Sequence, residues 1–295
     1  MNQEQASKIG YGRGFLAALD QSGGSTPKAL AQYGVPESGY ATEDEMFDRM
    51  HAFRSRIITA PAFNGDRILG AILFEQTMDR DVAGTATPAY LWDRKQVVPF
   101  VKVDEGLADE TDGVRLMKPF TKLDDVLARA TRRRVFGTKM RSFIARSNSA
   151  GVAAVLDQQF AYAERILDAD LMPIIEPEVD IHSEEKQSAE ELLRQGILDR
   201  LSGLPDGRQV MLKLSIPTQD DFYAELIEHP KIVRVVALSG GYSQHDADAR
   251  LARNHGLIAS FSRALTEDLR HRQTDDEFNR RLDTSIAAIE RASTT

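Results

Sequence analysis

The chain has 295 residues, of which 42% are hydrophobic and 28% charged, so it can bury a large core as one α/β barrel or as two ordinary domains. Its net charge of −8 argues against a nucleic-acid partner held by phosphate neutralisation, and the absence of cysteine excludes disulfides, thiolate nucleophiles and cysteine metal sites. The first residues lack the apolar segment of a signal peptide and no apolar run is long enough to span a bilayer, so we expect a cytoplasmic protein with no membrane partner.

Eight short apolar runs, most of them bounded by turn-forming or charged residues, predict eight buried strands. In chain order they cover residues 15–20, 69–75, 97–104, 138–144, 171–179, 209–217, 232–239 and 257–262. The fifth run contains Pro173 and Pro177, which we expect to stop the ladder of hydrogen bonds near the end of that strand.

Helical patterns separate most of these strands. They cover residues 42–59, 123–135, 148–170, 183–201, 218–229, 243–255 and most of 263–292. Thr42 and Glu45 form a capping-box pattern at the start of the first of them, and Pro27 suits the first turn of a further helix. The glycine-rich residues 10–14 precede a strand rather than follow one, so they are predicted to be a loop and not a nucleotide-binding motif.

Strands that alternate with helices, with no linker-like break in composition, indicate an α/β fold. The count of eight strands predicts a single (β/α)8 TIM barrel that forms one domain over residues 1–295, with extra helical segments at the N-terminal and C-terminal ends.

The C-terminal ends of the predicted strands carry many charged and small polar residues. In a barrel these ends meet at one mouth, where the functional site is built. They carry Asp20, Glu75, Lys102, Asp104, Lys139, Arg141, Glu176, Glu178, Lys213, Ser239, Gly240, Gly241, Ser262 and Arg263. Any single charge among them could belong to a structural ion pair, but several lysines and carboxylates in one mouth indicate a site. The histidines avoid the strand ends and show no ligand spacing, so we expect no metal site.

Lys213 stands in the middle of the apolar sixth strand, where a charged group is costly unless it is paired. Taken alone, it is most simply a lysine whose stem lies in the core and whose ammonium reaches water. With Lys139 and Arg141 facing the same interior, it is instead a candidate nucleophile that forms a Schiff base with a carbonyl substrate. Glu176 and Glu178 are then the candidates for delivering a proton to the leaving hydroxyl, near neutral pH if other carboxylates or an apolar surround keep one of them protonated.

Two groups of residues are predicted to bind anions. Ser239, Gly240 and Gly241 follow the seventh strand and offer backbone N–H groups, and Arg263 adds a cation one strand later, which is typical of a phosphate site in a barrel. An ordinary turn is the simpler interpretation of the glycine pair by itself. A second anion site across the mouth would use Lys102, Ser22, Ser25 and Lys28.

In this register the sequence resembles class I fructose-bisphosphate aldolase, the Schiff-base-forming kind, and most closely its shorter bacterial form. The resemblance covers residues 15–265 and lies in eight segments: residues 16–20, 72–75, 101–104, 139–141, 173–178, 212–213, 238–241 and 262–265. The family's pattern has tryptophan where this chain has Met140, so only the charged positions on either side carry over.

The resemblance implies reversible cleavage of fructose 1,6-bisphosphate to dihydroxyacetone phosphate and glyceraldehyde 3-phosphate, without a cofactor or metal. It implies that Lys213 forms the imine, Glu176 is the acid/base for dehydration and Asp20 assists carbon–carbon cleavage, with Lys139 and Glu178 as supporting charges. It assigns one phosphate to Ser239, Gly240, Gly241, Ser262 and Arg263, and the other end of the substrate to Ser22, Ser25, Lys102 and Arg141.

Two other interpretations stay open from the sequence. One is a Schiff-base aldolase for another sugar phosphate, which is favoured if only one phosphate site exists. The other is a non-catalytic barrel used as a binding scaffold, because a fold alone does not fix a function. Self-association into a homo-oligomer is also left open.

Overall fold

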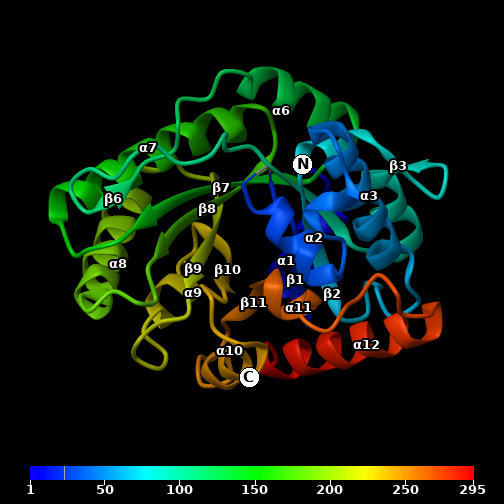
Figure 1. The fold of residues 1–295 in the computed structure, drawn as a ribbon. Coiled ribbons are helices and arrows are strands. Elements are labelled where there is room, and N and C mark those ends of the chain that lie inside the picture. Colours follow the sequence, from blue (N-terminus) through cyan, green and yellow to red (C-terminus); the bar gives the residue numbers. More distant parts are fainter. Residues whose placement is uncertain (23) are drawn as a thin grey trace.

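The computed structural model describes residues 1–22 and 24–295. Eight parallel strands form a closed ring in the order β5-β2-β1-β11-β10-β9-β8-β7, and pairing between β5 and β7 closes it (Figure 1). The strands are β1 (Phe15–Leu19), β2 (Ile68–Leu73), β5 (Val98–Lys102), β7 (Gly137–Ile144), β8 (Met172–Val179), β9 (Val210–Ser215), β10 (Ile232–Leu238) and β11 (Ile258–Phe261). The predicted TIM barrel is confirmed, and each predicted strand is present.

Helices surround this ring (Figure 1). They are α1 (Gln3–Tyr11), α2 (Thr26–Tyr33), α3 (Glu43–Thr59), α4 (Glu75–Asp79), α5 (Thr87–Ala89), α6 (Leu123–Arg132), α7 (Ser149–Asp168), α8 (Lys186–Gly203), α9 (Ala224–Ile227), α10 (Gln244–Leu251), α11 (Arg263–Thr266) and α12 (Asp275–Ala292). Short additions are the 3-10 turn η1 (Glu37–Gly39), the π turn η2 (Tyr90–Arg94), the hairpin β3 (Asp81–Val82) with β4 (Thr85–Ala86), and β6 (Val114–Arg115), which pairs antiparallel with β7. No helix in the described ranges is long and apolar enough to cross a membrane.

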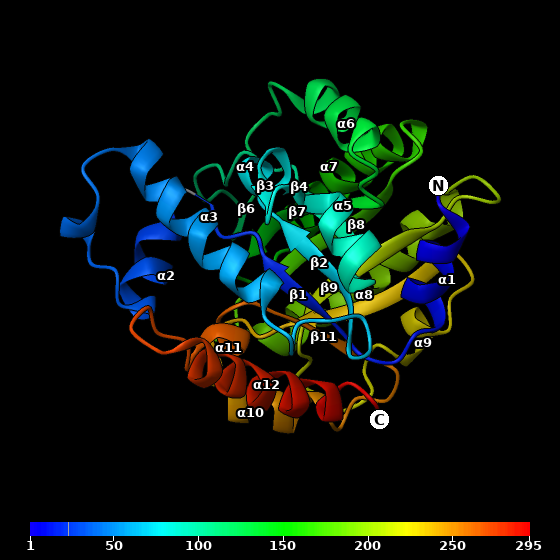
Figure 2. The ribbon, with the colours of Figure 1, turned by 90° about the vertical axis from the view of Figure 1, so that its right-hand side faces the viewer.

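Two apolar clusters hold the barrel together. The larger one lies between the strands and the surrounding helices, and the smaller one fills the interior of the ring. Helix α1 contributes Ile9 to the interior cluster and lies at the opposite end of the barrel from α2 and α3 (Figure 2). Arg234 of β10 fixes the end of α1 by donating hydrogen bonds to the carbonyls of Ile9 (3.0 Å), Gly10 (2.7 Å) and Gly12 (3.1 Å). The prediction of a loop over residues 10–14 is therefore wrong for its first two residues, which belong to α1.

Strand β2 ends two residues earlier than predicted. Phe74 is the N-cap of α4, and Glu75 is the first residue of that helix rather than the last of the strand. The Glu75 carboxylate pairs with Lys122 (2.9 Å) and with Arg129. The expectation that Glu75 belongs to the ring of charge at the mouth is thus wrong, because its backbone has already turned into a helix.

Several helix limits also differ from the sequence patterns. The predicted helix over 218–229 is reduced to α9, α10 ends at Leu251, and the pattern over 263–292 divides into α11 and α12. Helix α12 begins with a full capping box between Thr274 and Glu277 that the patterns did not indicate. At the predicted box, Thr42 accepts from the Glu45 N–H (3.2 Å), whereas the Glu45 side chain accepts from Ala41 instead.

Candidate active site

The period of two along each strand decides what faces the barrel interior. Side chains alternate between the two faces of a strand, so residues two apart share a face. On β8, Ile174 belongs to the interior apolar cluster and Glu176 follows it toward the C-terminal mouth; on β9, Met211 and Lys213 are related in the same way. The interior is therefore apolar at its base and charged at its mouth.

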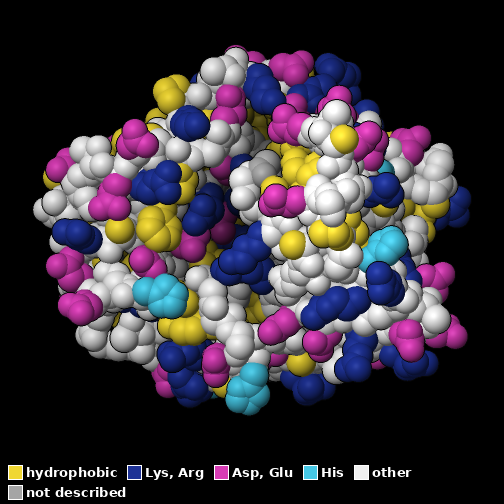
Figure 3. All heavy atoms as spheres, in the orientation of Figure 1, with side chains coloured by type: hydrophobic (Ala, Val, Ile, Leu, Met, Phe, Trp, Pro, Cys, Tyr) yellow, Lys and Arg dark blue, Asp and Glu magenta, His cyan; other side chains and the backbone are white. Residues whose placement is uncertain are grey.

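The mouth opens into a cavity of about 340 Å³, within the range expected for a small-molecule site. Lysines, arginines and carboxylates gather in this hollow at the centre of the face shown in Figure 3. The cavity is lined by Asp20, Ser22, Ser25, Lys102, Lys139, Arg141, Glu176, Glu178, Lys213, Ser239, Gly240, Ser262 and Arg263, all of them predicted from the sequence, whereas Glu75, Asp104 and Gly241, which were also predicted to lie at the mouth, do not line it. None of the residues that the structure describes around the cavity is a histidine.

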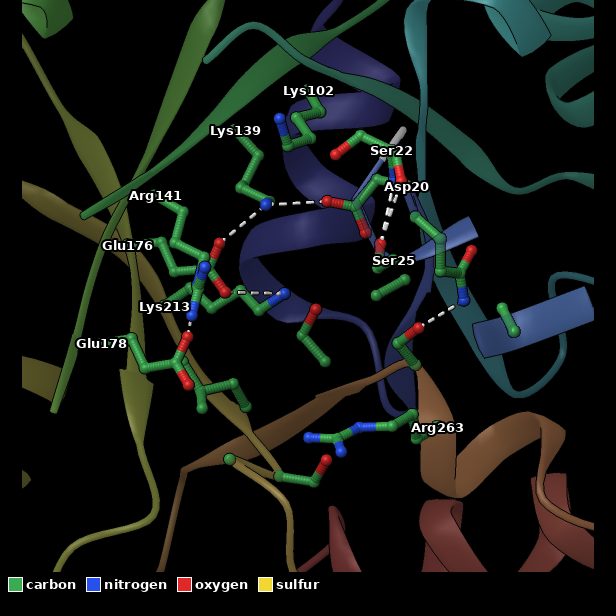
Figure 4. Close-up of a pocket in the computed structure, with 18 of the residues that line it drawn as sticks. Asp20, Ser22, Ser25, Lys102, Lys139, Arg141, Glu176, Glu178, Lys213 and Arg263 are labelled. Carbon is green, nitrogen blue, oxygen red and sulfur yellow. Dashed lines mark hydrogen bonds and ion pairs between the residues drawn. The ribbon is translucent and has the colours of Figure 1, made fainter. Parts of the chain in front are cut away.

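Two buried lysines share the carboxylate of Glu176 at the centre of the site (Figure 4). The Lys139 ammonium lies 2.8 Å from Glu176 Oε2 and 2.7 Å from Asp20 Oδ2, and the Lys213 ammonium lies 3.0 Å from Glu176 Oε1. Lys213 is 4% exposed and Lys139 3%. The four side chains form one chain of alternating charge from β1 to β9, in which Lys139 is held by two carboxylates and Lys213 by one.

This arrangement fixes the protonation of three of the four groups. Burial alone would lower the pKa of Lys139, but the charges of Asp20 and Glu176 outweigh it and raise that pKa well above its ordinary value. Burial would raise the pKa of Asp20 and of Glu176, but Lys139 and Lys213 outweigh it and lower both. At neutral pH Lys139 is therefore a cation, and Asp20 and Glu176 are carboxylates. The structure differs here from the expectation that neighbouring carboxylates keep a glutamate protonated, because the charges nearest to Glu176 are lysines.

The cations on the other side of the mouth are already paired. Arg141 forms an ion pair with Glu178, and the Lys102 ammonium lies 2.7 Å from Asp104 Oδ1. Lys28 also lines the cavity and makes no ion pair within residues 1–22 and 24–295. The predicted second anion site thus keeps its residues in place, but two of its cations are neutralised by neighbouring carboxylates.

The predicted phosphate site after β10 is different, because its cation is not paired. Gly240 and Gly241 have φ of 61° and 122°, conformations that side chains with a Cβ rarely adopt. A Cβ at Gly241 would stand 3.5 Å from the Arg263 guanidinium. In the described part of the chain Arg263 has no carboxylate partner, and Figure 4 shows its guanidinium beside the cavity. A free guanidinium beside a glycine turn can bind a phosphate group.

The sequence patterns missed Gln21, Gln32, Ser260 and Thr266, which line the cavity, and the buried Arg54. Gln21 lines the cavity and donates from Nε2 to Ser262 Oγ (2.5 Å), and Ser260 lines it with a hydroxyl that has no partner among the described residues. Arg54 of α3 lies behind them, 2% exposed, and donates to the Gln21 carbonyl and to Thr77 Oγ1 (2.8 Å). Signals for two of them existed in the sequence: Ser260 lies two residues before Ser262 in the predicted strand, and Arg54 lies one turn after Met50, on the apolar face of its helix.

Comparison of the chain with known proteins identifies its family. The family model described as "Fructose-bisphosphate aldolase class-I" matches residues 3–201. Proteins named fructose-bisphosphate aldolase class 1 from Synechocystis sp. and Clostridium acetobutylicum are 58% and 56% identical to this chain, over all of it and over 98% and 100% of their own lengths. A solved structure of fructose-bisphosphate aldolase from Plasmodium falciparum is 19% identical, with a TM-score of 0.72 over 99% of this chain and 94% of that one, and it supports the barrel fold.

The predicted family and enzyme class are confirmed by these matches, which extend well beyond the short segments quoted from the sequence. Class I aldolases are metal-independent lyases that work through a Schiff base on a lysine. The chain belongs to the class I fructose-bisphosphate aldolase family.

Proposed function

We propose that this protein catalyses the reversible cleavage of fructose 1,6-bisphosphate to dihydroxyacetone phosphate and glyceraldehyde 3-phosphate, with Lys213 as the lysine that forms the Schiff base. The observation that carries this assignment is the contact of the buried Lys213 ammonium with a single carboxylate oxygen, 3.0 Å away on Glu176, at the floor of the cavity. We also propose that the chain acts as one domain, in the cytoplasm, in glycolysis and gluconeogenesis.

The choice between the two buried lysines follows from their partners. A lysine attacks a carbonyl only as the neutral amine. Lys139 is held between Asp20 and Glu176, and these carboxylates raise its pKa, so it remains an ammonium. Lys213 has one carboxylate partner, and that partner is close enough to accept its proton directly. Lys139 then serves as a fixed positive charge beside both carboxylates, which are ionised before substrate binds.

The steps use groups that are already in contact. The Lys213 ammonium passes a proton to Glu176, and the neutral amine adds to the C2 carbonyl to form a carbinolamine. Protonated Glu176 returns the proton to the C2 hydroxyl, which leaves as water and gives the iminium ion. Asp20, ionised because Lys139 lowers its pKa, accepts the proton of the C4 hydroxyl as the bond between C3 and C4 breaks. The aldehyde leaves and the three-carbon enamine stays on Lys213.

The order of the strands supports an orientation for the substrate. Strand β9 pairs with β10, and β10 pairs with β11, so Lys213 lies on the same side of the ring as Ser239, which follows β10, and Arg263, which begins α11 just after β11. The C1 phosphate of the ketose is attached next to the C2 carbon that forms the imine, so it belongs at this nearer anion site. The C6 phosphate then reaches the side of the mouth with Ser22, Ser25 and Lys28.

Borohydride trapping tests the assignment of the nucleophile. Reduction in the presence of dihydroxyacetone phosphate should add one substrate-derived mass to the protein, and peptide mapping should place it on Lys213, because borohydride reduces the iminium to a stable amine. A chelator in the same assay should leave the cleavage rate unchanged. An adduct on another lysine, or loss of activity in the chelator, would contradict the proposal.

A comparison of two substrates tests the second anion site and separates the proposal from its nearest alternative, a Schiff-base aldolase for another sugar phosphate. The pairing of Arg141 with Glu178 and of Lys102 with Asp104 is the observation that keeps this alternative in view. We expect fructose 1,6-bisphosphate to be cleaved with a kcat/KM about 10-fold or more above that of fructose 1-phosphate, since one charge-assisted contact contributes about 1.5–3 kcal/mol.

Two variants show which anion site is responsible for the difference in kcat/KM. Lys28→Met should lower kcat/KM for the bisphosphate and leave the 1-phosphate unaffected, whereas Arg263→Met should lower it for both substrates. Equal kcat/KM values for the two substrates in the unmodified protein would favour the alternative enzyme.

A further inference from the structure

Strand β9, which carries Lys213, is held unequally on its two sides. All six residues of β9 are registered with β10, but only Met211 and Leu212 are registered with β8. The β8–β9 ladder therefore stops just before Glu176 and Lys213, the two residues whose side chains meet across it. In the described part of the chain, no residue of β9 after Leu212 is registered with β8.

Proline explains why the ladder stops. The Val179 N–H points toward β9, since it donates to Ser215 Oγ, and N–H groups alternate in direction along a strand. Position 177 therefore faces β9 as well, and Pro177 has no N–H to donate. Two residues later, the Ser215 side chain connects β9 to β8. Its hydroxyl accepts from the Val179 N–H (3.0 Å) and donates to the Val179 carbonyl (2.6 Å).

A buried ion pair on α8 holds the continuation of the same strand. The Lys186 ammonium pairs with Glu190 and also donates to the Ile216 carbonyl (2.9 Å) and to Thr218 Oγ1 (3.1 Å). The second carboxylate oxygen of Glu190 accepts from the Thr218 N–H (3.0 Å). Lys186 is 7% exposed and Glu190 1%. Residues 216–218 thus make three hydrogen bonds with two charged side chains, two donated by Lys186 and one accepted by Glu190.

This pair is not part of the active site described above. Neither Lys186 nor Glu190 lines the cavity. A buried ion pair is also a poor source of stability, because well-packed apolar residues of the same size often stabilise a protein as well or better. What distinguishes this pair is where its remaining hydrogen bonds go, which is to the segment that leaves β9 after Lys213.

We propose that Lys186 and Glu190 are positioning residues for Lys213: by fixing residues 216–218, and together with the Ser215 hydroxyl, they hold the end of β9 against β8 so that the Lys213 ammonium stays at hydrogen-bonding distance from Glu176. This inference rests on the proposed role of Lys213. Its effect is on proton transfer and imine formation, because displacement of a reacting group by about 1 Å can slow a step by about 100-fold.

The main test is the double variant Lys186→Met/Glu190→Leu. It replaces both charges by apolar side chains of similar length, so the fold can be kept while the hydrogen bonds to residues 216–218 are lost. We expect kcat and the rate of borohydride-trappable adduct formation to fall about 10- to 100-fold, with KM changed by less than about 3-fold. The matched control is Arg200→Met, on the same helix. Arg200 binds α7 through Asp157 (2.7 Å) and the Ala153 carbonyl (3.0 Å), and its side chain makes no hydrogen bond or ion pair to β9 among the described residues.

The possible results distinguish a failure of this inference from a failure of the proposed function. A folded double variant with the kcat and trapping rate of the unmodified protein would overturn the inference, and so would a loss of kcat matched by Arg200→Met at the same melting temperature. If the double variant does not fold, Glu190→Gln, which keeps the shape and removes the charge, decides in the same assays: a kcat loss at constant KM supports the inference and an unchanged kcat rejects it. Adduct formation that survives in Lys213→Met would instead reject the proposed function.

Discussion

Replacement of Lys213 by methionine should abolish cleavage and leave the fold intact. Methionine is close to lysine in length and suits the buried position, and Glu176 keeps its contact with Lys139 at 2.8 Å, so no carboxylate is left unpaired. Loss of a covalent nucleophile typically lowers turnover by about 10⁴-fold or more. The measurement is steady-state cleavage of fructose 1,6-bisphosphate, with a thermal melt on the same sample.

A lysine outside the cavity provides the control. Lys95 donates its ammonium to the carbonyls of Thr59 (3.2 Å) and Ala60 (2.8 Å), and it lies away from the mouth. Lys95→Met should therefore retain full turnover. Turnover that persists in Lys213→Met, together with a trapped adduct on Lys139, would show that the two buried lysines have been assigned the wrong way round.

The second large effect is expected on stability, from Lys139→Met. This change leaves Asp20 without its ion pair and Glu176 with Lys213 alone, in a site where both carboxylates are buried. Removal of one partner from a buried ion pair costs about 3–5 kcal/mol of the free energy of unfolding. Denaturant unfolding at pH 7.5, compared with the unmodified protein, measures this loss directly.

The pH dependence of stability in acid should be weaker in this variant. In the unmodified protein the pKa values of Asp20 and Glu176 are lowered on folding, so their contribution is present above the unfolded pKa values, about 3.9 and 4.3, and is lost as the pH falls below them. Without Lys139, the burial that raises the pKa of Asp20 is opposed only by the more weakly acting Lys213 and Lys102, so the pKa of Asp20 is lowered less on folding and less stability is lost in acid. A variant that loses as much stability as the unmodified protein does when the pH falls below about 4 would contradict the charge arrangement.

The sequence allowed the barrel and most of its mouth to be predicted because both depend on local patterns. Apolar runs with a period of two identify strands, and the position of a charge at the end of a run identifies the mouth. Glu75 was misplaced because Leu73 and Phe74 are both apolar, and only the turn of the backbone at Phe74 shows that the strand has ended. The limits of a strand depend on its neighbours in the ring, which a single run does not contain.

The pairing of charges could not be predicted for a related reason. Lys139 and Lys213 look alike as buried lysines near the ends of apolar strands. What separates them is that Lys139 meets Asp20 from β1, more than a hundred residues earlier in the chain, as well as Glu176 from the next strand. The position of Arg54 on the apolar face of α3 marks it as buried, but its acceptors, the Gln21 carbonyl and Thr77, could not be predicted because tertiary packing brings them to it.

The closure of the barrel base by α1 has a consequence for the order in which the protein is made. Ile9 leaves the ribosome well before Arg234, which fixes the end of its helix and follows 225 residues later. Strand β1 likewise waits for β11 to complete the ring. Contacts so distant in sequence form slowly, because the long loop between them must close first. The apolar side of α1 and the open side of β1 are therefore exposed throughout most of synthesis, and this is the period in which the nascent chain is most open to aggregation.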